Sequence, residues 1–155
     1  MDQHKLVYVT IINTTPEKLW AALTDPGFTR QYWFGTSVQS DWRIGSSIVF
    51  RRRGQISDEG TVLECKPPRS LAFRFHHLPD QGMGGERASR VTFEIEPLGR
   101  KPGPQGKGVC LTLTHEDFPP NSKVYGGICQ GWPAILSSLK TLLETGRSLN
   151  LSWRG

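Results

Sequence analysis

The residues that come nearest to a catalytic cluster end a predicted strand, where His115 is followed by Glu116 and Asp117. Apolar residues alternate along 109–113, so a strand that continues this pattern turns the His115 side chain inward. A buried imidazole beside Glu116 or Glu64 could act as a general base or donate a hydrogen bond to a ligand. The competing interpretation is a core histidine whose ring nitrogens are satisfied by neighbours. His115 is the one catalytic candidate that the sequence offers.

The other histidines and the cysteines form no metal-binding pattern. His76 and His77 are sequence neighbours, so on a strand they point to opposite faces and do not chelate one ion together. The three cysteines, Cys65, Cys110 and Cys129, show neither a CxxC pair nor a zinc-like spacing with histidine. We therefore expect no metal and no cofactor, and free thiols in a reducing compartment.

Acidic residues and short motifs add no further chemistry. Motifs for nucleotide binding, serine hydrolysis, zinc proteolysis or calcium binding are missing from the sequence. Glu59 and Glu64 are five residues apart, so they lie on opposite faces of a strand and do not form a paired-carboxylate site. Most of Asp58, Glu59 and Glu64 are expected to be exposed charges on a sheet.

Net charge is positive but dispersed. Lys and Arg number 19 against 14 Asp and Glu, a formal charge of +5, and the only tight basic run is 51–53. Nucleic-acid-binding proteins concentrate such charge on one face, so we expect no nucleic-acid partner. No segment approaches the roughly 18 apolar residues of a membrane span, and the apolar run after residue 5 is too short for a signal peptide. These features predict a cytoplasmic protein with no membrane span.

The N-terminal segments that position these residues begin with a strand. Residues 6–12 are rich in β-branched and aromatic types, which predicts a strand. Thr15 followed by Pro16 is a typical helix start and opens a pair of short helices over about 15–34.

Along the rest of the chain, the spacing of apolar residues changes twice. Alternation predicts strands over about 37–115, with two polar, glycine-rich loops at 79–89 and 99–108. A period of 3.6 predicts a long helix over about 122–146, which contains a proline and ends at a glycine. Residues 1–155 therefore form one α+β domain, a six- to seven-stranded curved antiparallel sheet around a long C-terminal helix.

Large side chains fall on segments that face the space between sheet and helix. An aromatic-lined gap of this kind is typical of an apolar ligand pocket, and the alternative is that the same rings fill the core. The predicted ligand-binding residues are Trp33, Phe50, Phe75, Phe93, Leu113, His115, Trp132 and Leu136. His115 is the expected polar anchor, and access is expected near the loop 79–89.

Three stretches then point to a known family: residues 15–26 (TPEKLWAALTDP), 41–46 (DWRIGS) and 131–136 (GWPAIL). In order and spacing the chain resembles the START-like (SRPBCC) superfamily, and within it the C-terminal domain of the activator of the heat-shock-protein-90 ATPase. The resemblance implies a helix-grip (Bet v 1-like) fold that holds a small hydrophobic molecule between helix and sheet. It carries over no catalytic residue, because the superfamily shares no catalytic set.

Three functional hypotheses remain open at this point. The first is binding or sequestration of a small hydrophobic ligand, lipid-like or aromatic, without catalysis. The second is a cyclase or hydrolase that uses His115 in the same cavity. The third is a chaperone-related protein-interaction module, with an interaction surface around 51–53. The chain begins directly at the START-like strand, so the resemblance to one domain of the co-chaperone does not by itself predict co-chaperone activity.

Overall fold

One curved sheet of seven antiparallel strands dominates the computed structural model, which describes residues 4–78, 85–99 and 106–151. The strands are β1 (Leu6–Ile12), β2 (Ser37–Ser40), β3 (Ser47–Arg52), β4 (Gln55–Lys66), β5 (Ser70–His77), β6 (Ser89–Pro97) and β7 (Val109–Glu116). They lie in the order β1-β7-β6-β5-β4-β3-β2. Consecutive strands from β2 to β7 therefore pair as hairpins, and β1 returns beside β7.

Two short helices fill the connection between β1 and β2. They are α1 (Pro16–Thr24) and α2 (Pro26–Tyr32), and each begins with proline at its first position. The Thr15 hydroxyl accepts a hydrogen bond from the Lys18 amide (3.2 Å), and the Asp25 carboxylate accepts one from the Gly27 amide (2.7 Å). These N-caps satisfy amides that have no partner within the helix, so the local sequence starts both helices.

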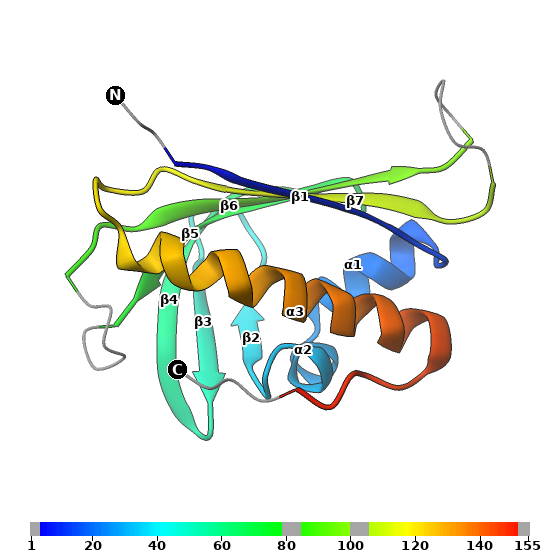
Figure 1. The fold of residues 1–155 in the computed structure, drawn as a ribbon, viewed down its shortest axis with the longest axis horizontal. Helices are drawn as coiled ribbons and strands as arrows, with labels where there is room; N and C mark the ends of the chain where they lie inside the picture. Colours follow the sequence, from blue (N-terminus) through cyan, green and yellow to red (C-terminus); the bar gives the residue numbers. More distant parts are fainter. Residues whose placement is uncertain (1–3, 79–84, 100–105, 152–155) are drawn as a thin grey trace.

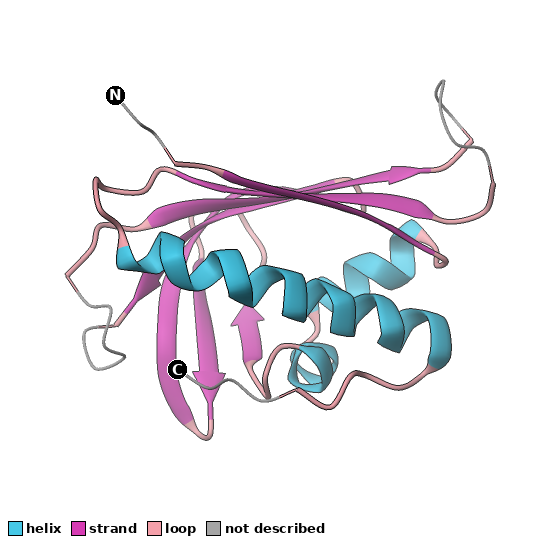
Figure 2. Cartoon of the chain, viewed as in Figure 1, coloured by secondary structure: helices cyan, strands magenta, loops and turns pink. Residues whose placement is uncertain are grey.

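The long helix α3 (Lys123–Thr145) lies across the concave side of the sheet (Figures 1 and 2). Its first turn is capped twice. The Ser122 hydroxyl accepts from the Tyr125 amide (2.9 Å), and the Glu86 carboxylate accepts from the Ser122 hydroxyl (2.6 Å) and the Lys123 amide (2.7 Å). Gly146 ends the helix in the left-handed conformation (φ 84°), as expected for a C-cap.

Aromatic rings bridge the sheet and α3 in the core. Phe50 on β3 lies 5.8 Å from Phe73 on β5, and Phe73 lies 6.2 Å from Phe93 on β6 (ring centroids). Phe93 then meets Trp132 of α3 edge-on at 5.8 Å. Such tilted and edge-to-face pairs add to the stabilisation that burial of the rings provides. This row of rings fixes where α3 crosses the sheet.

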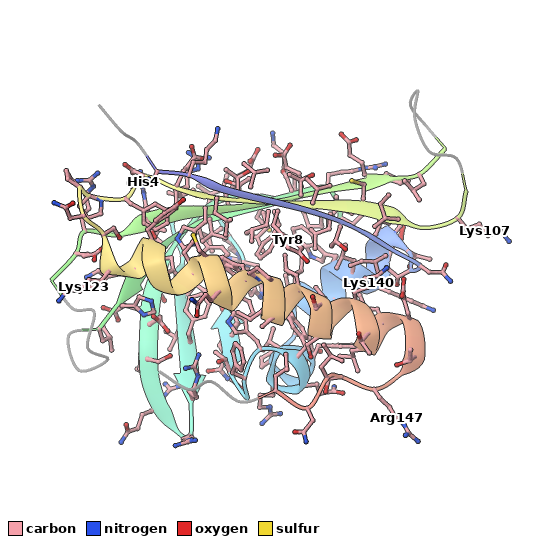
Figure 3. The ribbon with its side chains drawn as sticks, in the orientation of Figure 1. His4, Tyr8, Lys107, Lys123, Lys140 and Arg147 are labelled. Atoms are coloured by element: carbon pink, nitrogen blue, oxygen red, sulfur yellow. The ribbon has the colours of Figure 1, made fainter. Side chains whose placement is uncertain are left out.

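The architecture confirms the predicted α+β helix-grip fold, with seven strands and a C-terminal helix close to the predicted 122–146. Of the two predicted loops, the parts at 79–84 and 100–105 lie outside the described residues. Lys107, Lys123 and Arg147 point away from the body of the protein at well-separated places (Figure 3), in keeping with the dispersed charge.

Gly60 on β4 provides the first testable prediction. A Cβ at this position would lie 1.7 Å from the backbone carbonyl oxygen of Arg74 on β5 and 3.3 Å from Ile48. Because the closest obstacle is backbone, it cannot move aside as a flexible side chain would. We expect Gly60→Ala to lower the free energy of unfolding by about 2–3 kcal/mol, as overpacking does, measured by urea denaturation.

Gly126→Ala is the matched control, because a Cβ there meets nothing within 4 Å. This exposed helical site should gain up to about 1 kcal/mol from helix propensity. Equal stability of the Gly60→Ala variant and the parent protein would contradict the close approach of β4 and β5.

Candidate functional site

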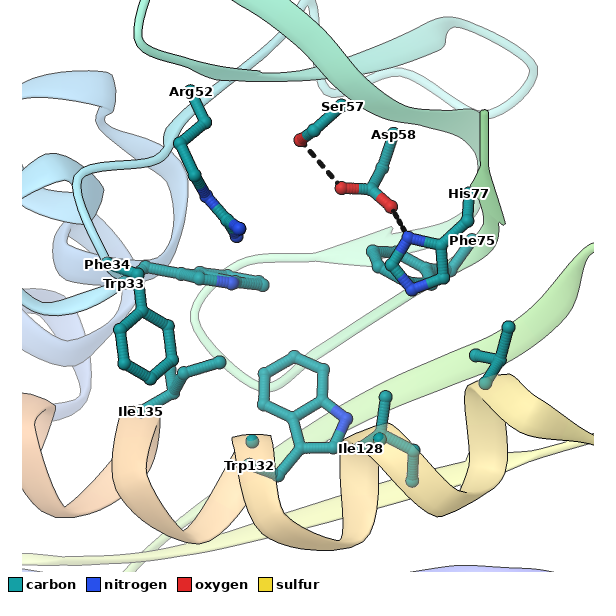
Figure 4. A pocket seen from close by; sticks show the side chains of 13 residues that line it. Trp33, Phe34, Arg52, Ser57, Asp58, Phe75, His77, Ile128, Trp132 and Ile135 are labelled. Atoms are coloured by element: carbon teal, nitrogen blue, oxygen red, sulfur yellow. Dashed lines mark hydrogen bonds and ion pairs between the residues drawn. The ribbon is translucent and has the colours of Figure 1, made fainter. Parts of the chain in front are cut away.

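A cavity of about 300 Å³ lies between α3, the end of α2 and strands β3 to β5 (Figure 4). This volume is at the lower end of the range for small-molecule pockets. The lining residues are Trp33, Phe34, Arg52, Ser57, Asp58, Phe75, His77, Val124, Gly127, Ile128, Gly131, Trp132 and Ile135. One side of the cavity is therefore apolar and the other carries charged groups.

Aromatic side chains form much of the apolar side. Trp33, which ends α2, packs edge-on against Trp132 of α3 with centroids 5.1 Å apart, and Phe75 of β5 also lines the cavity. On α3, Gly127 and Gly131 are four residues apart and so share the helix face toward the cavity. Because they carry no side chain, they leave space that larger residues would occupy.

A β-bulge builds the polar side. Phe50 pairs with Asp58, but the next residue of β3, Arg51, pairs with Ile56, so Ser57 is an extra residue in β4. In a regular strand, Ser57 and Asp58 would point to opposite faces, whereas a bulge lets neighbours share one. Both side chains are buried in the cavity wall, with Asp58 only 4% exposed. Asp58 is therefore an exception to the prediction that most of Asp58, Glu59 and Glu64 are exposed sheet charges.

Ser57, Asp58 and His77 form a chain of polar contacts in this wall, a hydrogen bond followed by an ion pair (Figure 4). The Ser57 hydroxyl donates to Asp58 Oδ2 (2.7 Å), and Asp58 Oδ1 pairs with Nδ1 of His77, the residue directly opposite it on β5. Because the carboxylate only accepts, the ring proton of His77 lies on Nδ1. In the neutral imidazole, Nε2 is then an acceptor with no hydrogen bond among the described residues, and Figure 4 shows it turned away from Asp58.

Arg52 is the cation of the cavity. Its Nε donates to the Thr36 hydroxyl (3.2 Å), and its guanidinium group reaches toward the ring of Trp33 (Figure 4). Burial is the main influence on its pKa and lowers it; the negative charge of Asp58 raises it, and Arg53 lowers it. An arginine keeps its charge despite such a shift, so the wall holds a partly desolvated positive charge.

His115 lies outside the cavity lining, with no exposed surface, and both of its ring nitrogens are engaged. The indole Nε1 of Trp132 donates to Nδ1 (2.9 Å), so the ring proton must be on Nε2, which donates to the Ser89 hydroxyl (2.6 Å). Burial, and secondarily His77, lowers the His115 pKa to about 3. The partners are thus an indole and a hydroxyl, rather than the carboxylate of Glu64 or Glu116.

The structure places the eight predicted ligand-binding residues in two groups. Trp33, Phe75 and Trp132 line the cavity. The others are buried in the core outside the lining: Phe50, Phe93, Leu113, His115 and Leu136.

The sequence reasoning missed the polar side of the cavity, although part of it left a signal. Arg52 follows inward-facing Phe50 by two residues, and His77 follows Phe75 by two, so alternation already turned both inward. Asp58 left no such signal, because the bulge that buries it is a property of the strand pair. Among the described residues, no group of three or more His, Cys, Asp or Glu side chains could hold a metal ion.

A seven-stranded sheet closed on a long C-terminal helix, with a cavity between them, defines the START-like helix-grip class. Residues 13–144 match the family described as Activator of Hsp90 ATPase homolog 1-like protein, and the chain belongs to this family. The resemblance predicted from the sequence is confirmed.

Solved structures with the same fold include three informative relatives. A Mesorhizobium loti protein is 25% identical with a TM-score of 0.72, over 90% of this chain and 96% of that one. The Aha1 dimer from Colwellia psychrerythraea is 21% identical with a TM-score of 0.72, over 94% and 99%. An HSP90 activator from Plasmodium falciparum is 19% identical with a TM-score of 0.70, over 90% and 95%. A search of curated proteins found no match.

No helix in the described ranges 4–78, 85–99 and 106–151 is both long and apolar enough to cross a membrane.

Proposed function

We propose that this protein binds a small, largely apolar molecule in the cavity between α3 and the sheet. The observation that carries the proposal is the cavity itself, with Trp33, Phe75 and Trp132 on its walls and glycines at 127 and 131 on the helix side. Aromatic walls with a few polar groups are the usual composition of a small-molecule site.

Catalysis through His115 receives no support from the geometry. Its Nδ1 accepts from Trp132 and its Nε2 donates to Ser89, so neither nitrogen is free to take a proton from a substrate. A general base must reach the proton that it abstracts, and His115 is not part of the cavity lining. Binding without chemistry at His115 is therefore the function that we propose.

Filling the cavity from α3 tests this proposal. Gly127→Leu places an isobutyl group on the cavity side of the helix, and we expect it to weaken binding of the neutral fluorescent probe N-phenyl-1-naphthylamine at least about tenfold. The measurement is a fluorescence titration. The parent protein should bind the probe with an increase in its emission.

Gly126→Leu is the matched control, because Gly126 is exposed, precedes Gly127 in the same helix and has open space around it. Both variants gain similar helix propensity, roughly 0.8 kcal/mol, so a difference between them reports on the cavity. Equal probe affinity in the two variants, or no binding by the parent, contradicts the proposal. Native mass spectrometry of the protein from its own host would then identify the natural ligand class as a retained adduct.

A second candidate function is contact with a chaperone of the Hsp90 type, which the family name and the Plasmodium relative suggest. An exposed apolar strip favours it: Val7, Val9 and Ile11 on the edge strand β1 are 49%, 58% and 43% exposed. Contiguous exposed apolar groups often mark a protein contact. Calorimetric titration into purified Hsp90 tests this function; absence of heat at micromolar concentrations would exclude a useful affinity.

We further propose a cytoplasmic location. All three cysteines are free thiols, which fits a reducing compartment. Fractionation of host cells followed by detection with an antibody tests it, and recovery outside the cytoplasm would contradict it.

A further inference from the structure

The polar wall of the cavity offers a ligand one donor and one acceptor. The acceptor is not Asp58, because its two carboxylate oxygens already contact Ser57 and His77. By holding the proton of His77 on Nδ1, the carboxylate leaves the Nε2 lone pair available to a ligand, since no described residue donates to it. A carboxylate that orients an imidazole in this way also stabilises the imidazolium that forms when Nε2 takes a proton.

On the donor side stands Arg52. Its Nε is used by Thr36, while the terminal guanidinium nitrogens have no hydrogen bond within the part of the chain that the structure describes. Figure 4 shows them on the cavity side of β3, across from His77. A partly buried guanidinium without an acceptor is unfavourable, and its planar fork matches a carboxylate.

The charge of the wall decides which ligand fits best. With His77 neutral, the positive charge of Arg52 and the negative charge of Asp58 sum to zero. A carboxylate that bound alone would leave an excess negative charge in a poorly hydrated cavity, which is costly. If one proton enters with it and rests on His77, two positive and two negative charges again sum to zero.

Resting on the proposed binding function, we propose that the cavity takes a hydrophobic carboxylic acid, whose carboxylate binds Arg52 while His77 takes up one proton. Free acids of this kind are ionised in neutral water, so the proton comes from the buffer, and Nε2 of His77 becomes an N–H donor toward the bound carboxylate. The apolar body of the acid lies against Trp33, Phe75 and Trp132. No covalent bond forms or breaks except the N–H bond of His77.

His77 is the group that receives the proton, because the other titratable groups that the structure describes around it already have a partner or a charge. Asp58 of β4 is its partner, Arg52 of β3 is already charged, and His115 of β7 uses both ring nitrogens. From α3, the lining residues carry no titratable side chain: Val124, Gly127, Ile128, Gly131, Trp132 and Ile135.

The test compares 2-naphthoic acid with 2-naphthamide, a neutral probe of nearly the same shape, by isothermal titration calorimetry. The titrations are run at about pH 8. We expect the acid to bind roughly tenfold or more tightly than the amide, because its hydrogen bonds to Arg52 are charge-assisted. Titrations in phosphate and in Tris, which differ in ionisation enthalpy, should show uptake of about one proton per acid bound and none for the amide.

Two variants separate the roles of the groups. Arg52→Gln should remove the preference for the acid, because the acid should lose at least about tenfold more affinity than the amide. His77→Gln should abolish proton uptake; if that variant does not fold, Asp58→Asn serves the same purpose, because it no longer stabilises a protonated His77.

The outcomes distinguish this inference from the proposed function. If the amide and N-phenyl-1-naphthylamine bind but the acid binds no more tightly, or binds without proton uptake, the acid-binding inference is overturned and the cavity still binds ligands. If none of the three probes binds, the inference and the proposed function fail together. Acid preference with uptake, lost in Arg52→Gln and His77→Gln respectively, supports both.

Discussion

Replacing His115 by leucine should lower the free energy of unfolding by about 3 kcal/mol, because the change removes two buried hydrogen bonds and leaves the Trp132 indole N–H without an acceptor. The Trp132 indole N–H loses its acceptor, and the Ser89 hydroxyl loses its donor. His115 has no exposed surface, so water does not replace either bond. Urea denaturation followed by far-ultraviolet circular dichroism measures the loss, and avoids the change in Trp132 fluorescence.

A double-mutant cycle provides the control for this prediction. Trp132→Phe removes the indole N–H, so in that background His115→Leu no longer leaves this donor without an acceptor. The two changes together should cost about 1 kcal/mol less than the sum of the single changes, as expected for residues in one hydrogen-bond network. Strict additivity, or a loss below about 0.5 kcal/mol for His115→Leu alone, would show that the histidine is not held as the structure indicates.

Acid should destabilise the protein through the same residue. Burial, with a smaller contribution from His77, lowers the His115 pKa to about 3, whereas an unfolded histidine titrates near 6.5. Between these values the unfolded chain binds a proton that the folded protein does not, so stability rises with pH. It is therefore lost as pH falls from about 6.5 toward 3, at up to about 1.4 kcal/mol per pH unit and on the order of 5 kcal/mol in total.

His115→Gln isolates this contribution from the titration of carboxylates, which affects parent and variant alike. The glutamine does not titrate, so the variant should lose stability less steeply than the parent between about pH 6 and pH 4. The measurement is urea denaturation at several pH values. Identical slopes for the two proteins in that interval would rule out a neutral, desolvated His115 in the folded state.

The fold could be predicted from the sequence because each of its elements has a local signal. Thr15 and Pro16 start α1 through a cap and a fixed φ, and Gly146 ends α3 because the left-handed conformation suits glycine. Alternation in the strands separated core from solvent. The same rule predicted that His115 faces inward, and the structure buries it completely.

The candidate site could be predicted only in part. Trp33, Phe75 and Trp132 line the cavity, whereas Phe50 and Phe93 obey the same period and pack into the core. Periodicity gives the face on which a side chain lies but not what lies opposite it. Whether an inward ring meets another ring or an empty space depends on where α3 crosses the sheet, which is set by contacts between segments far apart in the chain.

The sequence by itself determined the elements, their inward faces and the family, because these depend on local periodicity, caps and spacing. Tertiary structure decided the chemistry of the cavity. Ser57 and Asp58 share a face only because β4 has one residue more than β3 at their bulge, and Asp58 meets His77 only because β4 and β5 pair in that register. His115 is likewise a structural residue, because Ser89 of β6 and Trp132 of α3 hydrogen-bond to its two ring nitrogens. These partners come from another strand and another layer, so the spacing of residues in the sequence does not reveal them.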